Sequence, residues 1–122
     1  MLRPEFKVVT LLRRKPGMSR EDFIRHYESR HAVLATRVIP GLIDYRRMYL
    51  DPGRSAFGVP ADAPGFDVIT TLVFADAQAY ERAFAAFSEP EVIQQISADE
   101  ADLFDRSSIR AYVVEEHQSE LP

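Results

Sequence analysis

Two histidines five residues apart, His26 and His31, are the first candidates for chemistry in this chain. They lie in a segment whose apolar spacing predicts a helix over about residues 20–37. One face of that helix collects His31 and the apolar residues Phe23, Ile24, Tyr27, Leu34, Ala35 and Val38. Five α-helical steps leave His26 roughly 140° from His31, so we expect His26 to face solvent.

An imidazole on the buried face could act as a general base, because its reference pKa of about 6.5 is easily shifted. The alternative interpretation is a core histidine that is satisfied by a hydrogen bond from the sheet. Tyr27 precedes His31 by four residues, so the two side chains should be neighbours. Its phenol could donate to a ligand oxygen, although an aromatic residue at this position is also typical of core packing.

Asp67 is the second acid–base candidate. It stands near the start of an otherwise apolar strand, where a carboxylate is costly unless it is exposed or paired. It could orient His31 or polarise a substrate hydroxyl, or it could simply bond loop amides at the end of the strand. Arg46, Arg47 and Arg110 could bind a carboxylate, but ion pairs with the many acidic residues are an equally simple explanation.

Several kinds of site are not expected. The chain has no cysteine, which excludes disulfides, zinc–thiolate sites and thiol nucleophiles. The five glycines are isolated, and the histidines lack the spacing of a helical zinc motif. We therefore predict no metal site and no cofactor-binding residues. A net charge of −4 argues against nucleic acid as a partner, and no apolar run is long enough to span a membrane. A cytoplasmic location is the default expectation.

The elements that must position these residues follow from the hydrophobic pattern. Strands are expected at residues 5–14, 42–50, 66–74 and 109–115, and Ser19 and Asp76 are expected to cap two helices. Pro90 should begin a second piece of the later helix. The loop over 51–65 is unusually long. We expect one domain over residues 1–116, followed by a flexible polar tail at 117–122.

This order of elements predicts an α+β, ferredoxin-like split βαβ sandwich: a four-stranded antiparallel sheet with its helices on one face. The first strand carries apolar residues on both sides. A second cover is then needed for the open face, and a symmetric partner is the commonest way to provide one. We therefore predict a homodimer whose two sheets face each other.

Two stretches carry a family resemblance: RKPGMSREDFIRHYESRHAVLA at 14–35 and ADEADLFDRSSIRAYVVEE at 98–116. Both resemble EthD-type proteins, a branch of the dimeric α+β barrels. The resemblance implies that fold, a small pocket between helices and sheet, and a pocket position for His31. It also matches Asp67 to an acidic position of the third strand. Related barrels include cofactor-free monooxygenases, lactone isomerases, polyketide cyclases, decarboxylases and haem-degrading enzymes.

Three functions are compatible with these observations. The first is a cofactor-free enzyme that acts on a small lactone or an aromatic, polyketide-like compound, with His31 moving a proton and Asp67 or Tyr27 assisting. The second is a non-catalytic ligand-binding or accessory protein of a degradation pathway, in keeping with the family name. The third is haem binding through His31. In each case the expected partner is a small ligand rather than nucleic acid or membrane.

Overall fold

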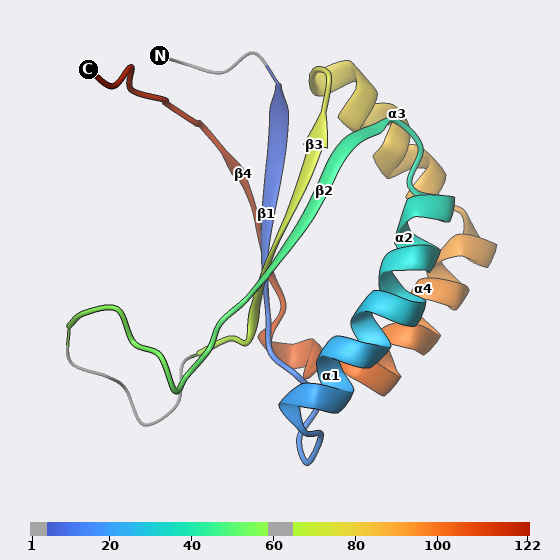
Figure 1. Cartoon of the computed structure of the whole chain (residues 1–122). Coiled ribbons are helices and arrows are strands. Elements are labelled where there is room, and N and C mark those ends of the chain that lie inside the picture. Colours follow the sequence, from blue (N-terminus) through green and yellow to red (C-terminus); the bar gives the residue numbers. More distant parts are fainter. Residues whose placement is uncertain (1–4, 59–64) are drawn as a thin grey trace.

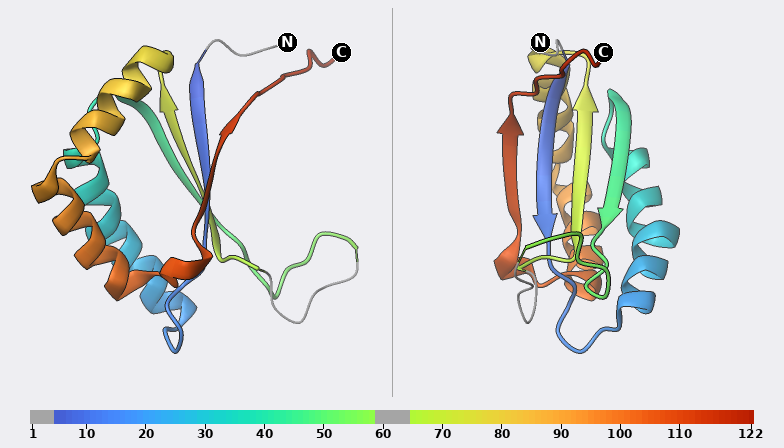
Figure 2. Two further views of the ribbon diagram at one scale, coloured as in Figure 1. Left: turned by 180° about the vertical axis from the view of Figure 1, so that it is seen from behind. Right: turned by 60° about the vertical axis from the view of Figure 1, so that its left-hand side comes forward.

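A computed structural model describes residues 5–58 and 65–122 of the chain. Its sheet contains β1 (Phe6–Leu12), β2 (Leu42–Tyr49), β3 (Val68–Phe74) and β4 (Arg110–Val114), in the order β2-β3-β1-β4. All pairings are antiparallel. The helices α1 (Arg20–His26), α2 (Ala32–Val38), α3 (Ala77–Phe87) and α4 (Pro90–Leu103) cover one face (Figures 1 and 2). The predicted ferredoxin-like α+β fold is confirmed.

Local signals explain where the helices begin. The Ser19 hydroxyl accepts a hydrogen bond from the Asp22 amide at 3.1 Å, and the Asp76 carboxylate accepts one from the Ala79 amide at 2.8 Å. Each bond satisfies one of the amides that a helix start leaves free. Pro90 occupies the first turn of α4, where its missing N–H costs nothing.

The predicted first helix is not a uniform α-helix. A π-helical turn, η1 (Tyr27–His31), separates α1 from α2, and the Ala32 amide bonds back five residues to the Tyr27 carbonyl. Such wide turns are rare and are often found at functional sites. Hydrophobic spacing does not reveal this turn, because Phe23, Tyr27, His31 and Leu34 keep the three-and-four spacing of an ordinary α-helix.

An aromatic core anchors this turn against the sheet. Phe23 is fully buried and packs edge-on against Tyr27, Tyr49 and Phe104, with ring centroids 5.9 to 6.1 Å apart. Tyr27 and Leu103 are buried with it. The π turn therefore rests on rigid, well-packed rings, which is what a precisely placed side chain requires.

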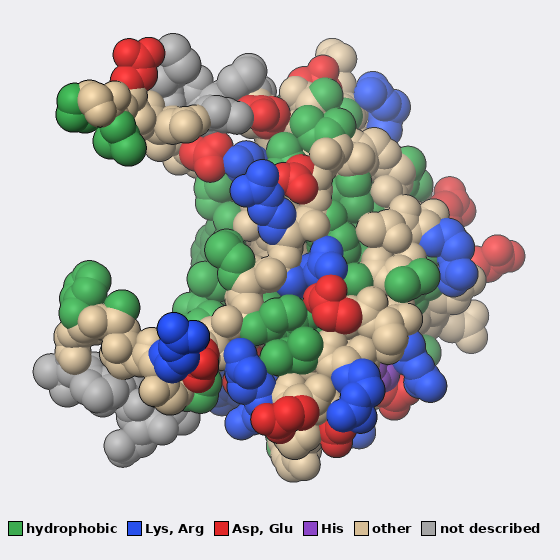
Figure 3. Space-filling model, in the orientation of Figure 1, with side chains coloured by type: hydrophobic (Ala, Val, Ile, Leu, Met, Phe, Trp, Pro, Cys, Tyr) green, Lys and Arg blue, Asp and Glu red, His purple; other side chains and the backbone are tan. Residues whose placement is uncertain are grey.

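Among the described residues, no helix covers the opposite face of the sheet. In Figure 3 it appears as a hollow between the C-terminal segment and residues 51–58, with hydrophobic side chains along it. Residues 59–64 of the predicted loop and residues 1–4 of the predicted domain lie outside the described residues. Within the part that the structure describes, no helix combines the length and apolar character needed to cross a membrane.

Candidate active site

A cavity of about 150 Å³ lies between the helices and the sheet. Its wall is mainly aliphatic and aromatic, with contributions from β1, β2, β3, the π turn, α2, α3 and α4. The polar side chains that line it are Thr10, Tyr27, His31, Tyr45, Thr70 and Glu100. A concave, mostly apolar space with a few converging polar groups is the usual form of a small-molecule site.

His31, at the end of the π turn, is held by a carboxylate from α4. Its Nδ1 lies 2.8 Å from Asp99 Oδ2, and the residue is 8% exposed. A carboxylate can only accept hydrogen bonds, so in the neutral imidazole the proton must be on Nδ1. Nε2 is then left with a free lone pair, and no described residue hydrogen-bonds it. His31 is in the form that a general base requires.

Burial is the main influence on the titration of His31. It lowers the pKa of the imidazole, because the charged form loses hydration. The hydrogen bond to Asp99 and its negative charge raise that pKa, and the nearby His26 lowers it. The net effect is a pKa below 6.5, so the imidazole is predominantly neutral at pH 7.

The expectation that His26 faces solvent is wrong. Its side chain is only 14% exposed, and its Nε2 lies 2.9 Å from Asp99 Oδ1. The geometric reason is the π turn, which aligns residues five apart instead of separating them by about 140°. His26 and His31 consequently bind the two oxygens of one carboxylate.

Hydroxyl groups line the sheet side of the cavity. The Tyr27 hydroxyl lies 2.6 Å from Thr70 Oγ1 and 3.4 Å from the Tyr45 hydroxyl. Burial raises the pKa of both tyrosines, so both phenols stay protonated and can act only as neutral hydrogen-bonding groups near pH 7. Tyr27 and His31 pack edge to face, with ring centroids 5.2 Å apart. The structure therefore brings these two predicted site residues together.

Asp67 lies elsewhere. Its Oδ2 accepts a hydrogen bond from the Arg14 amide at 2.8 Å, and Oδ1 is 3.7 Å from Arg14 Nε. Its backbone joins the ends of β1 and β2 through Leu12 and Leu50. It does not line the cavity. This geometry favours the strand-end interpretation, and a catalytic role for Asp67 stays a prediction without geometric support.

The three arginines are engaged in other contacts. Arg46 pairs with Asp44, and Arg110 donates to the carbonyls of Ser107 and Ile109. Arg47 from β2 forms a two-pronged ion pair with Glu28 of the π turn, at 2.5 and 3.0 Å.

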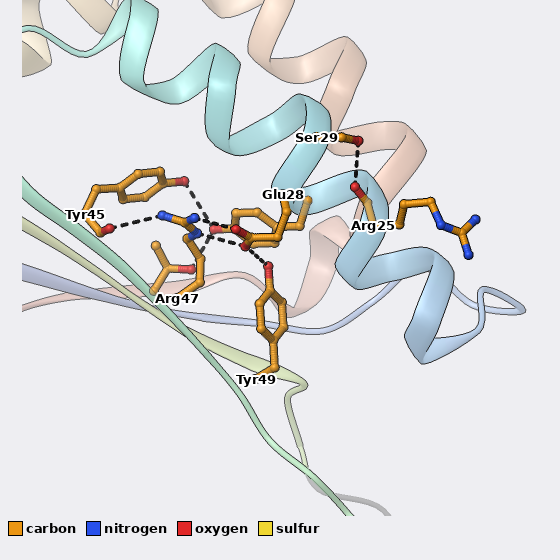
Figure 4. A network of polar contacts seen from close by, with 8 residues as sticks. Arg25, Glu28, Ser29, Tyr45, Arg47 and Tyr49 are labelled. Atoms are coloured by element: carbon orange, nitrogen blue, oxygen red, sulfur yellow. Dashed lines mark hydrogen bonds and ion pairs between the residues drawn. The ribbon is translucent and has the colours of Figure 1, made fainter.

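The Tyr49 hydroxyl also donates to Glu28, as Figure 4 shows. The bonds from Arg47 and Tyr49 hold the pKa of Glu28 below its usual range. The contacts of Arg47 and Tyr49 with Glu28 attach the π turn to β2. They thereby hold the backbone that carries Tyr27 and His31.

Sequence reasoning missed the residue that holds His31. Asp99 is 68 positions away, and only the packing of α4 against η1 reveals the contact. The stretch ADEADLFD was available as a signal, since it places two adjacent acids, Asp99 and Glu100, in a segment with family resemblance. Among the described residues, no cluster of three or more histidine or carboxylate side chains is arranged to hold a metal ion.

Comparison with known proteins agrees with this architecture. An EthD-family protein from Bacillus halodurans is 22% identical, with a TM-score of 0.63 over 96% of this chain and 100% of that chain. SnoaB, a cofactor-independent oxygenase from Streptomyces nogalater, is 16% identical, with a TM-score of 0.61 over 96% and 97% of the two chains. A dimeric protein of unknown function and ferredoxin-like fold from Bacteroides fragilis is 12% identical, with a TM-score of 0.58 over 95% and 100%.

These identities establish a shared fold and nothing further. No curated protein matches the sequence. The family model of the EthD domain, however, matches residues 15–107, which include the π turn, both histidines and Asp99. The chain belongs to the EthD-domain family.

Proposed function

We propose that this protein is a cofactor-independent enzyme that moves a proton on a small, oxygenated, partly apolar molecule. The observation that carries the proposal is the arrangement at His31: a neutral imidazole, held at Nδ1 by Asp99, at the wall of a mainly apolar cavity. Such a group takes a proton through Nε2, and Asp99 then stabilises the imidazolium that forms. Lactone isomerisation, cyclisation and cofactor-free oxygenation can begin with proton removal of this kind, and decarboxylation needs a proton delivered to carbon after carbon dioxide leaves.

The size and lining of the cavity limit the ligand. About 150 Å³ is below the 300–1,000 Å³ typical of drug-sized ligands, which favours a molecule of one or two rings. The apolar wall suits an aromatic or lactone ring, and the tyrosine and threonine hydroxyls suit its oxygens. The similarity to SnoaB supports the view that no cofactor is required. A cytoplasmic location and a role in degrading such compounds are part of the same proposal.

Haem does not fit this site. A porphyrin is far larger than the cavity of about 150 Å³. The remaining alternative is a binding protein without catalysis, which would use the same cavity.

A panel of small aromatic ketones, phenols and lactones, incubated with the protein and followed by liquid chromatography and mass spectrometry, tests the proposal. We expect His31→Ala to lower the consumption of any transformed compound by about 10²-fold or more. His117→Ala is the matched control, because His117 is exposed and pairs with Glu115 outside the cavity. Equal rates for wild type and His31→Ala would contradict the proposal. Binding without any transformation would favour the binding-protein alternative.

We also infer that two copies pair through their open sheet faces. Val9, Leu11 and Ile69 point away from the helices and are only partly buried, and Met48 on the same face is 52% exposed. The dimeric state of the Bacteroides fragilis protein supports this inference. Light scattering should give about twice the 13.9 kDa chain mass. Met48→Lys should lower that mass, whereas Val33→Lys, at an exposed position of α2, should not. A wild-type mass of one chain at micromolar concentration would refute the dimer.

A further inference from the structure

We propose that Glu100 is a second acid–base residue of the cavity, and that it protonates a carbonyl oxygen of the ligand while His31 removes a proton from the adjacent carbon. The inference rests on the proposed function and narrows its substrates to enolisable ketones, lactones and related carbonyl compounds.

The geometry of α4 separates the roles of two adjacent acids. Consecutive helical residues point about 100° apart. Asp99 faces the π turn and binds His26 and His31. Glu100, in contrast, lines the cavity together with His31. Within residues 5–58 and 65–122, no group hydrogen-bonds the Glu100 carboxyl. A carboxyl at a cavity wall without a protein partner is available to a ligand.

The surroundings of Glu100 make its carboxyl harder to ionise. Burial is the main cause and raises the pKa of its carboxyl, the charge of Asp99 raises it further, and Arg106 opposes both. The other titratable groups that line the cavity are His31 and the two tyrosines from η1 and β2, whose phenols remain neutral.

Burial thus raises the pKa of the Glu100 carboxyl and lowers the pKa of the His31 imidazole. The two shifts increase the fraction of molecules in which Glu100 can donate a proton while His31 can accept one. Environments that assign complementary roles to two titratable groups are typical of acid–base sites.

The proposed step is an enolisation. The C–H bond next to the carbonyl breaks, its proton moves to His31 Nε2, and its electron pair forms a carbon–carbon double bond. The π electrons of the carbonyl group bind the proton from Glu100, so the carbonyl oxygen becomes a hydroxyl group. The products are an enol, an imidazolium facing Asp99 and a Glu100 carboxylate. Return of both protons to the ligand, at the same or another carbon, restores the protein without any oxidant or co-reactant.

Deuterium exchange into β-tetralone, followed by proton NMR in deuterium oxide, tests this step. The wild-type protein should accelerate exchange next to the carbonyl, and Glu100→Gln should slow it by about 10²-fold. Glu91→Gln, at an exposed position in the first turn of the same helix, is the matched control and should behave as wild type. In the wild type the rate should fall at high pH as Glu100 loses its proton, and this fall should be absent in Glu100→Gln. A merely structural role would not remove it.

The outcomes separate the two proposals. Loss of exchange in His31→Ala with an unchanged rate in Glu100→Gln would overturn the role of Glu100 and leave the proposed function intact. An unchanged rate in His31→Ala would overturn the proposed base. Exchange at the buffer rate in the wild type would overturn the enolisation inference, while the compound panel would still decide whether His31 acts on other ligands.

Discussion

Replacement of Asp99 by Asn should disturb both the stability and the titration of the site. Asp99 accepts hydrogen bonds from His26 and His31 at 2.9 and 2.8 Å, and all three side chains are at most 16% exposed. A bond to a charged group contributes about 1.5–3 kcal/mol, against about 0.5–1.5 kcal/mol for a neutral bond. With two bonds weakened, Asp99→Asn should lower the free energy of unfolding by roughly 2 kcal/mol.

The same substitution should lower the pKa of His31. Asp99 raises that pKa through its hydrogen bond and its charge, and only the lowering effects of burial and of His26 remain without it. Urea unfolding measures the stability, and NMR titration of the imidazole C–H groups measures the pKa. Asp102→Asn, at an exposed position three residues further along α4, is the matched control. A His31 pKa that stays unchanged or rises in Asp99→Asn would refute this account of the site.

Three further predictions concern the core, the contacts of Arg47 and Tyr49 with Glu28 on the π turn, and the response of stability to pH. Phe23→Ala should lower the free energy of unfolding by about 3–5 kcal/mol in urea, because the ring is fully buried; a loss below 1 kcal/mol would be inconsistent with the described core. Glu28→Gln should lower the free energy of unfolding in urea by about 1 kcal/mol, since it removes the charge that Arg47 and Tyr49 bind. An unchanged urea midpoint would mean that these contacts do not stabilise the fold. Between about pH 7 and 5 the unfolded chain binds more protons at His31 than the folded chain does, so this residue makes stability fall as the pH drops below 6.5. The part of the acid destabilisation that comes from His31 should disappear in His31→Gln. An identical pH dependence of stability in the wild type and in His31→Gln would argue against the lowered pKa of His31.

The fold could be predicted because its signals are local. Alternating apolar residues, the caps at Ser19 and Asp76 and the proline at position 90 each specify an element from a few neighbouring residues. Their order then leaves few topologies open, and the observed one is among the commonest.

The site could be predicted only in part, because two of its determinants are not local. The inward position of His31 follows from helical spacing, but the π turn that brings His26 to the same side leaves almost no mark on the hydrophobic pattern. The partnership with Asp99 depends on how α4 packs against η1, across 68 residues of sequence. Asp67 attracted attention for a sound energetic reason, and the structure shows how that carboxylate is satisfied by Arg14.

The protonation state of His31 in the ligand-free protein at neutral pH tests the central claim most directly. Nitrogen-15 chemical shifts of the imidazole distinguish its two neutral tautomers from the imidazolium. We predict a proton on Nδ1, bound to Asp99, and an unprotonated Nε2 at the cavity. A proton on Nε2, in the other tautomer or in an imidazolium, would leave the cavity without a base and would contradict the account.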